Sequence, residues 1–157
     1  MTVTPTKETH VSHQSMIPPL DRLDVDVIAE PSGSGGVRWS QQIKDPGHNN
    51  GGKVKLPRGR GHKIKFGLKD RTNLNIRFDA SAPFFVREGS VGPCPSGMNS
   101  SQVMVDECDA DALVVTDWNY GAECELHYQL NFVDTTGKPI NSYDPIIENG
   151  GGGVPPW

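Results

Sequence analysis

Apolar residues recur at every second position over several short segments of this chain. The clearest segment is 123–134, where five apolar side chains face one way and five polar ones face the other. A period of two is typical of a β-strand with one buried face. The pattern therefore predicts a half-buried strand. Its apolar set is Cys124, Leu126, Tyr128, Leu130 and Phe132, and its polar set is Glu123, Glu125, His127, Gln129 and Asn131.

Other segments repeat this pattern and define a fold class. Turn-forming residues separate them at intervals of about 8–12 residues, and no ten-residue window carries an apolar stripe at helical spacing. We expect an all-β, two-sheet antiparallel sandwich of seven to nine short strands, immunoglobulin-like in size. The cysteine–tryptophan–cysteine spacing of true immunoglobulin domains is missing. The further predicted strands are 20–30, 53–56, 62–68, 73–79, 84–87, 103–105, 112–117 and one near 146–147.

Composition supports this fold and marks its ends. The chain contains 18 Gly and 13 Pro, which oppose helix interiors and favour turns. We expect residues 1–19 to be a disordered tail, 20–148 the sandwich domain and 149–157 a C-terminal tail, with 150–153 as a flexible leash. Because neither a signal-like apolar segment nor a membrane-length run is seen, a cytoplasmic, soluble protein with no membrane contact is expected.

Charge is divided along the chain. Eight Lys or Arg and one acid lie between positions 53 and 71, whereas ten acids and one base lie from position 106 onward. Segments 53–56 and 62–68 predict a hairpin with a basic face and a basic tip at 57–61. Three interpretations stay open: polyanion binding, protection of a sheet edge, and pairing with the acidic half, within one molecule or between subunits. The candidate anion-binding residues are Lys53, Lys55, Arg58, Arg60, Lys63 and Lys65.

Three cysteines form an odd set. A Cys94–Cys108 disulfide is one interpretation if the protein meets an oxidising compartment. A Cys₃His zinc set with Cys124 and His127 lacks the short ligand spacing of structural zinc sites. A blue-copper site is excluded because the sequence has no Cys, His and Met cluster near the C-terminal end. No metal ligand set and no cofactor are therefore predicted.

The polar face of segment 123–134 is the candidate catalytic group. Glu123, Glu125 and His127 would lie about 7 Å apart along one strand face, and Asp117 and Asp144 are candidates to join them. Carboxylates beside an imidazole suit acid–base chemistry or a divalent metal. The alternative is the ordinary wet face of an antiparallel strand.

The C-terminal third resembles the DP-EP family of small bacterial all-β proteins. The matching elements run from Trp118-Asn119-Tyr120 through the strand ending at Phe132 to the segment 143–150, which closes on Asp-Pro and Glu-Asn-Gly. The chain departs from the family where Asn149, not Pro, follows Glu148. The resemblance implies no activity and transfers no functional residue.

These observations favour a non-enzymatic binding or assembly protein. We expect a homo-oligomer in which the basic hairpin meets the acidic half of a neighbour, with Trp157 as a hydrophobic docking residue. One alternative is a small-molecule enzyme at Glu123, Glu125 and His127. A third hypothesis is a polyanion binder through residues 53–71.

Overall fold

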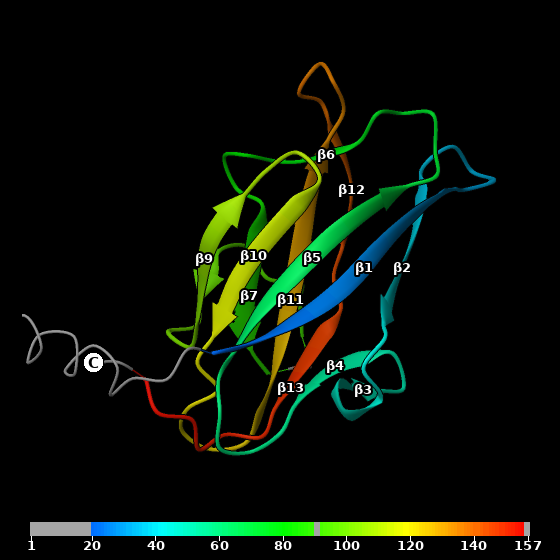
Figure 1. Ribbon diagram of the computed structural model, residues 1–157. Coiled ribbons are helices and arrows are strands. Elements are labelled where there is room, and N and C mark those ends of the chain that lie inside the picture. Colours follow the sequence, from blue (N-terminus) through cyan, green and yellow to red (C-terminus); the bar gives the residue numbers. More distant parts are fainter. Residues whose placement is uncertain (1–19, 90–91, 156–157) are drawn as a thin grey trace, which may run out of the picture.

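The computed structural model describes residues 20–89 and 92–155. Two β-sheets lie face to face (Figure 1), which confirms the predicted all-β sandwich. The expected tail at 1–19 lies outside the described residues, as does Trp157. Within the described ranges, no helix has both the length and the apolar character needed to cross a membrane.

Each sheet contains strands from several separate parts of the chain. The first sheet has the order β2-β1-β5-β10-β9, and its strands are β1 (Asp21–Pro31), β2 (Val37–Ile43), β5 (His62–Asp70), β9 (Val103–Cys108) and β10 (Ala112–Asp117). The second sheet has the order β3-β4-β13-β11-β7-β8, and β6 and β12 also pair with β11. Its strands are β3 (Asn49–Asn50), β4 (Lys53–Leu56), β6 (Arg77–Phe78), β7 (Phe84–Glu88), β8 (Met98–Asn99), β11 (Cys124–Val133), β12 (Pro139–Tyr143) and β13 (Ile146–Asn149). A 3₁₀ turn, Pro46–His48, precedes β3.

Strand pairing is mixed, not purely antiparallel as expected. In the described part of the chain, three strand pairs run parallel: β1 with β5, β4 with β13, and β7 with β8. A parallel pair needs a crossover between its strands. Here the crossover from β1 to β5 passes through β2 and then through β3 and β4 in the opposite sheet. Alternation of apolar residues cannot distinguish the two pairing directions, because it reports only which face is buried.

The centre of the core is an aromatic cluster between the sheets. The ring of Tyr128 lies 5.5 Å from Phe66 and 5.7 Å from Phe84, measured between centroids. Tyr128 is fully buried, and its hydroxyl donates to Oε1 of Gln41 at 2.9 Å. This bond satisfies the one polar atom of the ring, as buried tyrosines require. The inward positions of β11 predicted from the sequence are confirmed at Leu126, Tyr128, Leu130 and Phe132.

The predicted basic hairpin is wrong. Strand β4 belongs to the second sheet, whereas β5 occupies the middle of the first sheet, so β5 cannot protect an edge. The supposed tip is a crossover held against the 117–119 segment. There, Nδ2 of Asn119 donates to the carbonyl oxygens of Pro57 and Arg60 at 2.8 and 2.9 Å. A Cβ on Gly61 would lie 2.8 Å from the carbonyl oxygen of Asp117, so only glycine fits there.

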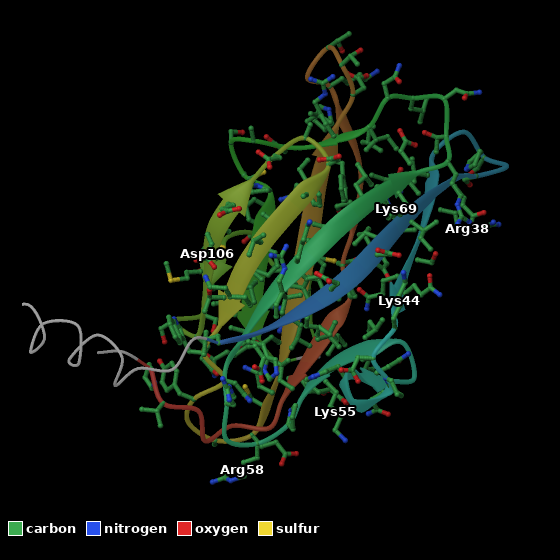
Figure 2. All side chains as sticks on the ribbon, viewed as in Figure 1. Arg38, Lys44, Lys55, Arg58, Lys69 and Asp106 are labelled. Atoms are coloured by element: carbon green, nitrogen blue, oxygen red, sulfur yellow. The ribbon has the colours of Figure 1, made fainter. Side chains whose placement is uncertain are left out.

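Basic side chains from this region do not form one patch. Figure 2 shows Lys55 and Arg58 near one end of the sandwich and Lys69 on β5, away from them. Nζ of Lys63 lies 2.9 Å from Asp106, and Nζ of Lys53 lies 3.6 Å from Glu125. Of the three interpretations of the basic segment, pairing with the acidic half within one molecule is therefore observed for these two lysines.

Segment 73–79 forms a strand only at Arg77–Phe78. The side chain of Asp70 accepts hydrogen bonds from the backbone N–H groups of Thr72 and Ile76 at 2.8 and 2.9 Å. These bonds fold the chain into a turn, which competes with a β-ladder. As a result, Leu74 is 45% exposed although the alternation placed it inward.

Residues 150–153 form a packed strap, not the expected flexible leash. The Gly150 N–H donates to the carbonyl oxygen of Leu56 at 2.8 Å, and the Gly153 N–H donates to that of Asn119 at 2.6 Å. A Cβ on Gly151 would lie 2.5 Å from the carbonyl oxygen of Gly121. The run of glycines therefore allows three backbone segments to approach one another closely.

We predict that Gly151→Ala destabilises the fold by about 3 kcal/mol or more. Gly137→Ala is the matched control, since both glycines have a positive φ (79° and 84°) but a Cβ on Gly137 would meet nothing within 4 Å. The control should cost only about 1 kcal/mol. Urea unfolding measures the free energy of unfolding of both variants. Equal losses of stability would contradict the close packing of the strap.

Candidate functional site

The predicted group of Glu123, Glu125 and His127 does not come together. Glu123 is exposed in the turn before β11, and Glu125 pairs with Lys53. His127 is only 9% exposed and makes its contacts elsewhere. A strand separates alternate residues by about 7 Å, so each of the three side chains meets different neighbours.

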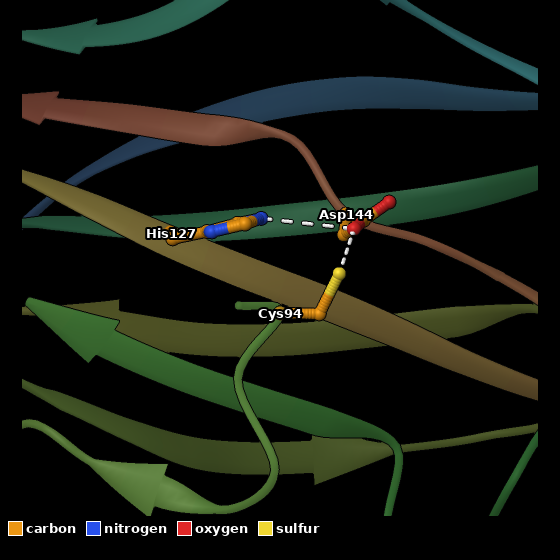
Figure 3. Close-up of side chains that lie close together, drawn as sticks. All are labelled: Cys94, His127 and Asp144. Carbon is orange, nitrogen blue, oxygen red and sulfur yellow. Dashed lines mark hydrogen bonds and ion pairs between the residues drawn. The ribbon is translucent and has the colours of Figure 1, made fainter. Parts of the chain in front are cut away.

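Three side chains from distant segments converge instead around His127 (Figure 3). They are Cys94 from the loop between β7 and β8, His127 from the outer face of β11, and Asp144 from the turn between β12 and β13. The thiol of Cys94 donates to Oδ2 of Asp144 at 2.6 Å, and Nε2 of His127 lies 3.7 Å from the same oxygen. One ligand-type atom from each residue lies within 4.8 Å of the others.

Pairing of β11 with two neighbours explains this convergence. His127 stands opposite Arg87 of β7 on one side and opposite Ile146 of β13 on the other. Directly opposite residues on one sheet face are close neighbours. Asp144 comes two residues before Ile146, so the turn into β13 brings the carboxylate to the imidazole.

Arg87 completes the cluster and anchors the loop that carries Cys94. Its Nη2 lies 3.1 Å from Nδ1 of His127, while Nε donates to the carbonyl oxygen of Pro93 at 2.7 Å and Nη1 to that of Gly89 at 3.0 Å. The planar guanidinium fork thus links β11 to the backbone beside Cys94.

The electrostatics of the cluster disfavour a nucleophilic cysteine. The hydrogen bond to the Asp144 carboxylate raises the pKa of the Cys94 thiol, because ionisation would place two negative charges side by side. Reactive cysteines require a lowered pKa. The groups can instead act as metal ligands when the Cys94 thiol releases its proton to solvent, since a thiolate, an imidazole and a carboxylate all bind borderline cations.

The remaining cysteines lie elsewhere. All three cysteines, which belong to the described part of the chain, carry free thiols, so no Cys94–Cys108 disulfide is formed. Burial raises the pKa of both Cys108 and Cys124. The considered Cys₃His set is therefore not assembled, and Asp144 joins Cys94 and His127 in its place.

Asp117, the other candidate acid, belongs to a buried polar cluster at one end of the sandwich. Its Oδ1 accepts hydrogen bonds from Nδ2 of Asn149 and from the backbone N–H of Asn119, both at 2.9 Å. Its Oδ2 and Oδ1 of Asn149 are buried and have no hydrogen-bond partner among the described residues. Burial raises the pKa of Asp117 from 3.8 to about 7, which favours the protonated form.

We predict that Asp117→Asn becomes more stabilising relative to wild type as pH rises from about 4 to about 7. A carboxyl group whose folded pKa is raised contributes stability at low pH and loses it as pH rises through the folded value. The change should reach a few kcal/mol above pH 7, because the amide cannot ionise.

Denaturant unfolding at pH 4.5 and pH 8, as a difference from wild type, measures this effect. The difference cancels the contribution of His62, whose pKa is lowered by burial. Asp111→Asn, at an exposed acid, is the control. A pH-independent difference for Asp117→Asn would show that the buried carboxyl keeps an ordinary pKa.

Comparison with protein-family models and with curated proteins gives no relative from which to assign this site. No protein-family model matches the chain, and no curated protein matches it significantly. The resemblance of the C-terminal third to the DP-EP family thus stays a prediction.

Proposed function

We propose that the chain is a non-enzymatic binding protein that takes up a transition-metal ion, such as Zn²⁺, through Cys94, His127 and Asp144. The observation that supports this proposal is the convergence of their three ligand-type atoms within 4.8 Å of one another. Sulfur, imidazole nitrogen and carboxylate oxygen are the ligands that zinc uses in proteins. Three different chain segments supply them, so their proximity is not a consequence of sequence spacing.

The distance from His127 to Asp144 is close to that of a tetrahedral site, whereas the distance from Cys94 to Asp144 is shorter. With usual zinc bond lengths, sulfur and oxygen ligands lie about 3.5 Å apart and nitrogen and oxygen ligands about 3.4 Å apart. The corresponding distances here are 2.6 Å and 3.7 Å. Binding therefore requires the thiol to move outward by about 1 Å. Cys94 is exposed on a loop, so this movement meets little packing resistance.

The charges of the three ligands match a divalent cation. When bound, the site would contain a thiolate, a carboxylate and a neutral imidazole, which together balance two positive charges. Three protein ligands leave a fourth position open. Cys94 and Asp144 are exposed, so that position faces solvent and suits reversible uptake better than a closed structural role.

Other functions have less support. The enzyme hypothesis relied on Glu123, Glu125 and His127, and these side chains meet different neighbours. Self-association and polyanion binding relied on a basic hairpin, and strands β4 and β5 lie in different sheets. Two of its lysines are also paired with acids within the molecule.

Titration with Co²⁺ tests the proposal, because cobalt substitutes for zinc and its bonds to thiolate are coloured. We expect a sulfur-to-cobalt charge-transfer absorption in wild type that is lost in Cys94→Ser and weakened in His127→Gln and Asp144→Asn. Removal of one ligand should reduce affinity at least about tenfold.

Cys108→Ser is the matched control. It removes another free thiol whose pKa is raised but which lies outside the cluster. This variant should keep both the absorption and the affinity of wild type. An absorption that survives in Cys94→Ser and disappears in Cys108→Ser, or no absorption in any protein, would contradict the proposed site.

A further inference from the structure

The hydrogen bond between Arg87 and His127 determines which ring nitrogen carries the proton. A guanidinium group can only donate hydrogen bonds. At 3.1 Å from Nη2 of Arg87, Nδ1 of His127 must therefore be the acceptor. A neutral imidazole has one ring proton, which then lies on Nε2 and points toward Oδ2 of Asp144, 3.7 Å away.

This tautomer conflicts with metal binding at Nε2 of His127. Nε2 is the nitrogen that faces Asp144, so a metal ion shared with Asp144 needs the lone pair of Nε2. The ring proton would have to move to Nδ1. There it would face the N–H of Arg87, and two hydrogen-bond donors would oppose each other. In most metal sites the second ring nitrogen donates to a carboxylate or carbonyl oxygen, the opposite of what Arg87 offers.

Arg87 is also held in this position by other contacts. Its Nε and Nη1 donate to the carbonyl oxygens of Pro93 and Gly89 at 2.7 and 3.0 Å. Because the guanidinium is planar and rigid, Nη2 cannot turn away from His127 without disturbing these bonds. Its positive charge adds repulsion toward a cation at the cluster.

We infer that Arg87 competes with the metal ion for His127 and so sets the affinity of the site. This inference rests on the proposed metal-binding function. Arg87 is then a positioning residue that maintains the metal-free cluster, with the proton on Nε2 and both Cys94 and His127 directed at Asp144. It weakens uptake, so that metal is bound only when its free concentration overcomes the competition.

Substitution of Arg87 tests whether this residue competes with the metal ion for His127 or instead supports metal binding. Arg87→Met keeps the aliphatic stem but removes the donors and the charge. We expect Arg87→Met to bind Co²⁺ about tenfold more tightly than wild type. Arg77→Met, which removes an exposed arginine on β6, should bind as wild type does. Equal or weaker binding by Arg87→Met would overturn the inference.

The nitrogen chemical shifts of His127 give a second readout that a merely structural role of Arg87 would not move. In metal-free wild type the ¹⁵N spectrum should show the proton on Nε2, and Zn²⁺ should transfer it to Nδ1. In metal-free Arg87→Met the preference for Nε2 should decline. A proton on Nδ1 in metal-free wild type would disprove the hydrogen bond on which the inference depends.

The two proposals fail in different ways. If neither wild type nor Arg87→Met gives the thiolate–cobalt absorption, metal binding itself is wrong, whatever the tautomer. If both proteins bind Co²⁺ through Cys94 with the same affinity, the metal site stands and the competition by Arg87 is wrong.

Discussion

Strand β11 is hydrogen-bonded on both sides, and this constraint positions both the core and the candidate site. Its register against β7 and β13 fixes where its side chains lie relative to those of the neighbouring strands. On the inner face this places Tyr128 against Phe66 and Phe84. On the outer face it places His127 beside Arg87 and near Asp144. Because the core prevents β11 from shifting by one residue, the imidazole is held on a rigid element, as binding sites require.

A second group of polar contacts closes one end of the sandwich. Asp117 accepts from Asn149 and Asn119, and Asn119 in turn holds the crossover between β4 and β5. The glycine strap passes through the same region. Polar groups buried together in this way are costly unless each finds a partner. Asp117 meets that condition best when it is protonated, since its second oxygen then becomes a donor.

The sequence was sufficient to identify sheets, buried faces and most strands. Residues 123–134 show why: the two-residue period is set by the strand itself, so Leu126 and Tyr128 could be placed inward without knowing their neighbours. Partners across the sheet were not predictable. Nothing near Arg87 in the sequence indicates that it stands opposite His127, because that contact depends on the register of β7 against β11.

The wrong predictions also arise because contacts between distant or neighbouring segments cannot be read from the apolar alternation. The segments 53–56 and 62–68 have the alternation and spacing of a hairpin, but Gly61 and the hydrogen bonds from Asn119 hold the connecting segment as a crossover. At 73–79, hydrogen bonds donated by backbone N–H groups to the Asp70 carboxylate overrode the apolar alternation. Asp144 could be named as a candidate from the sequence. Its contact with Cys94 could not be predicted, because that contact depends on how two distant loops fold.

The parallel pair of β4 and β13 has a consequence for the order of folding. Val54 pairs with Ile147, so these partners are separated by more than 90 residues of chain. Closing so long a loop before other contacts form costs considerable chain entropy, and topologies dominated by such pairings fold slowly. During synthesis β4 leaves the ribosome long before its partner exists. The first sheet, whose strands are complete at β10, can therefore assemble earlier, while the side of β4 that pairs with β13 stays unpaired until β13 has been made.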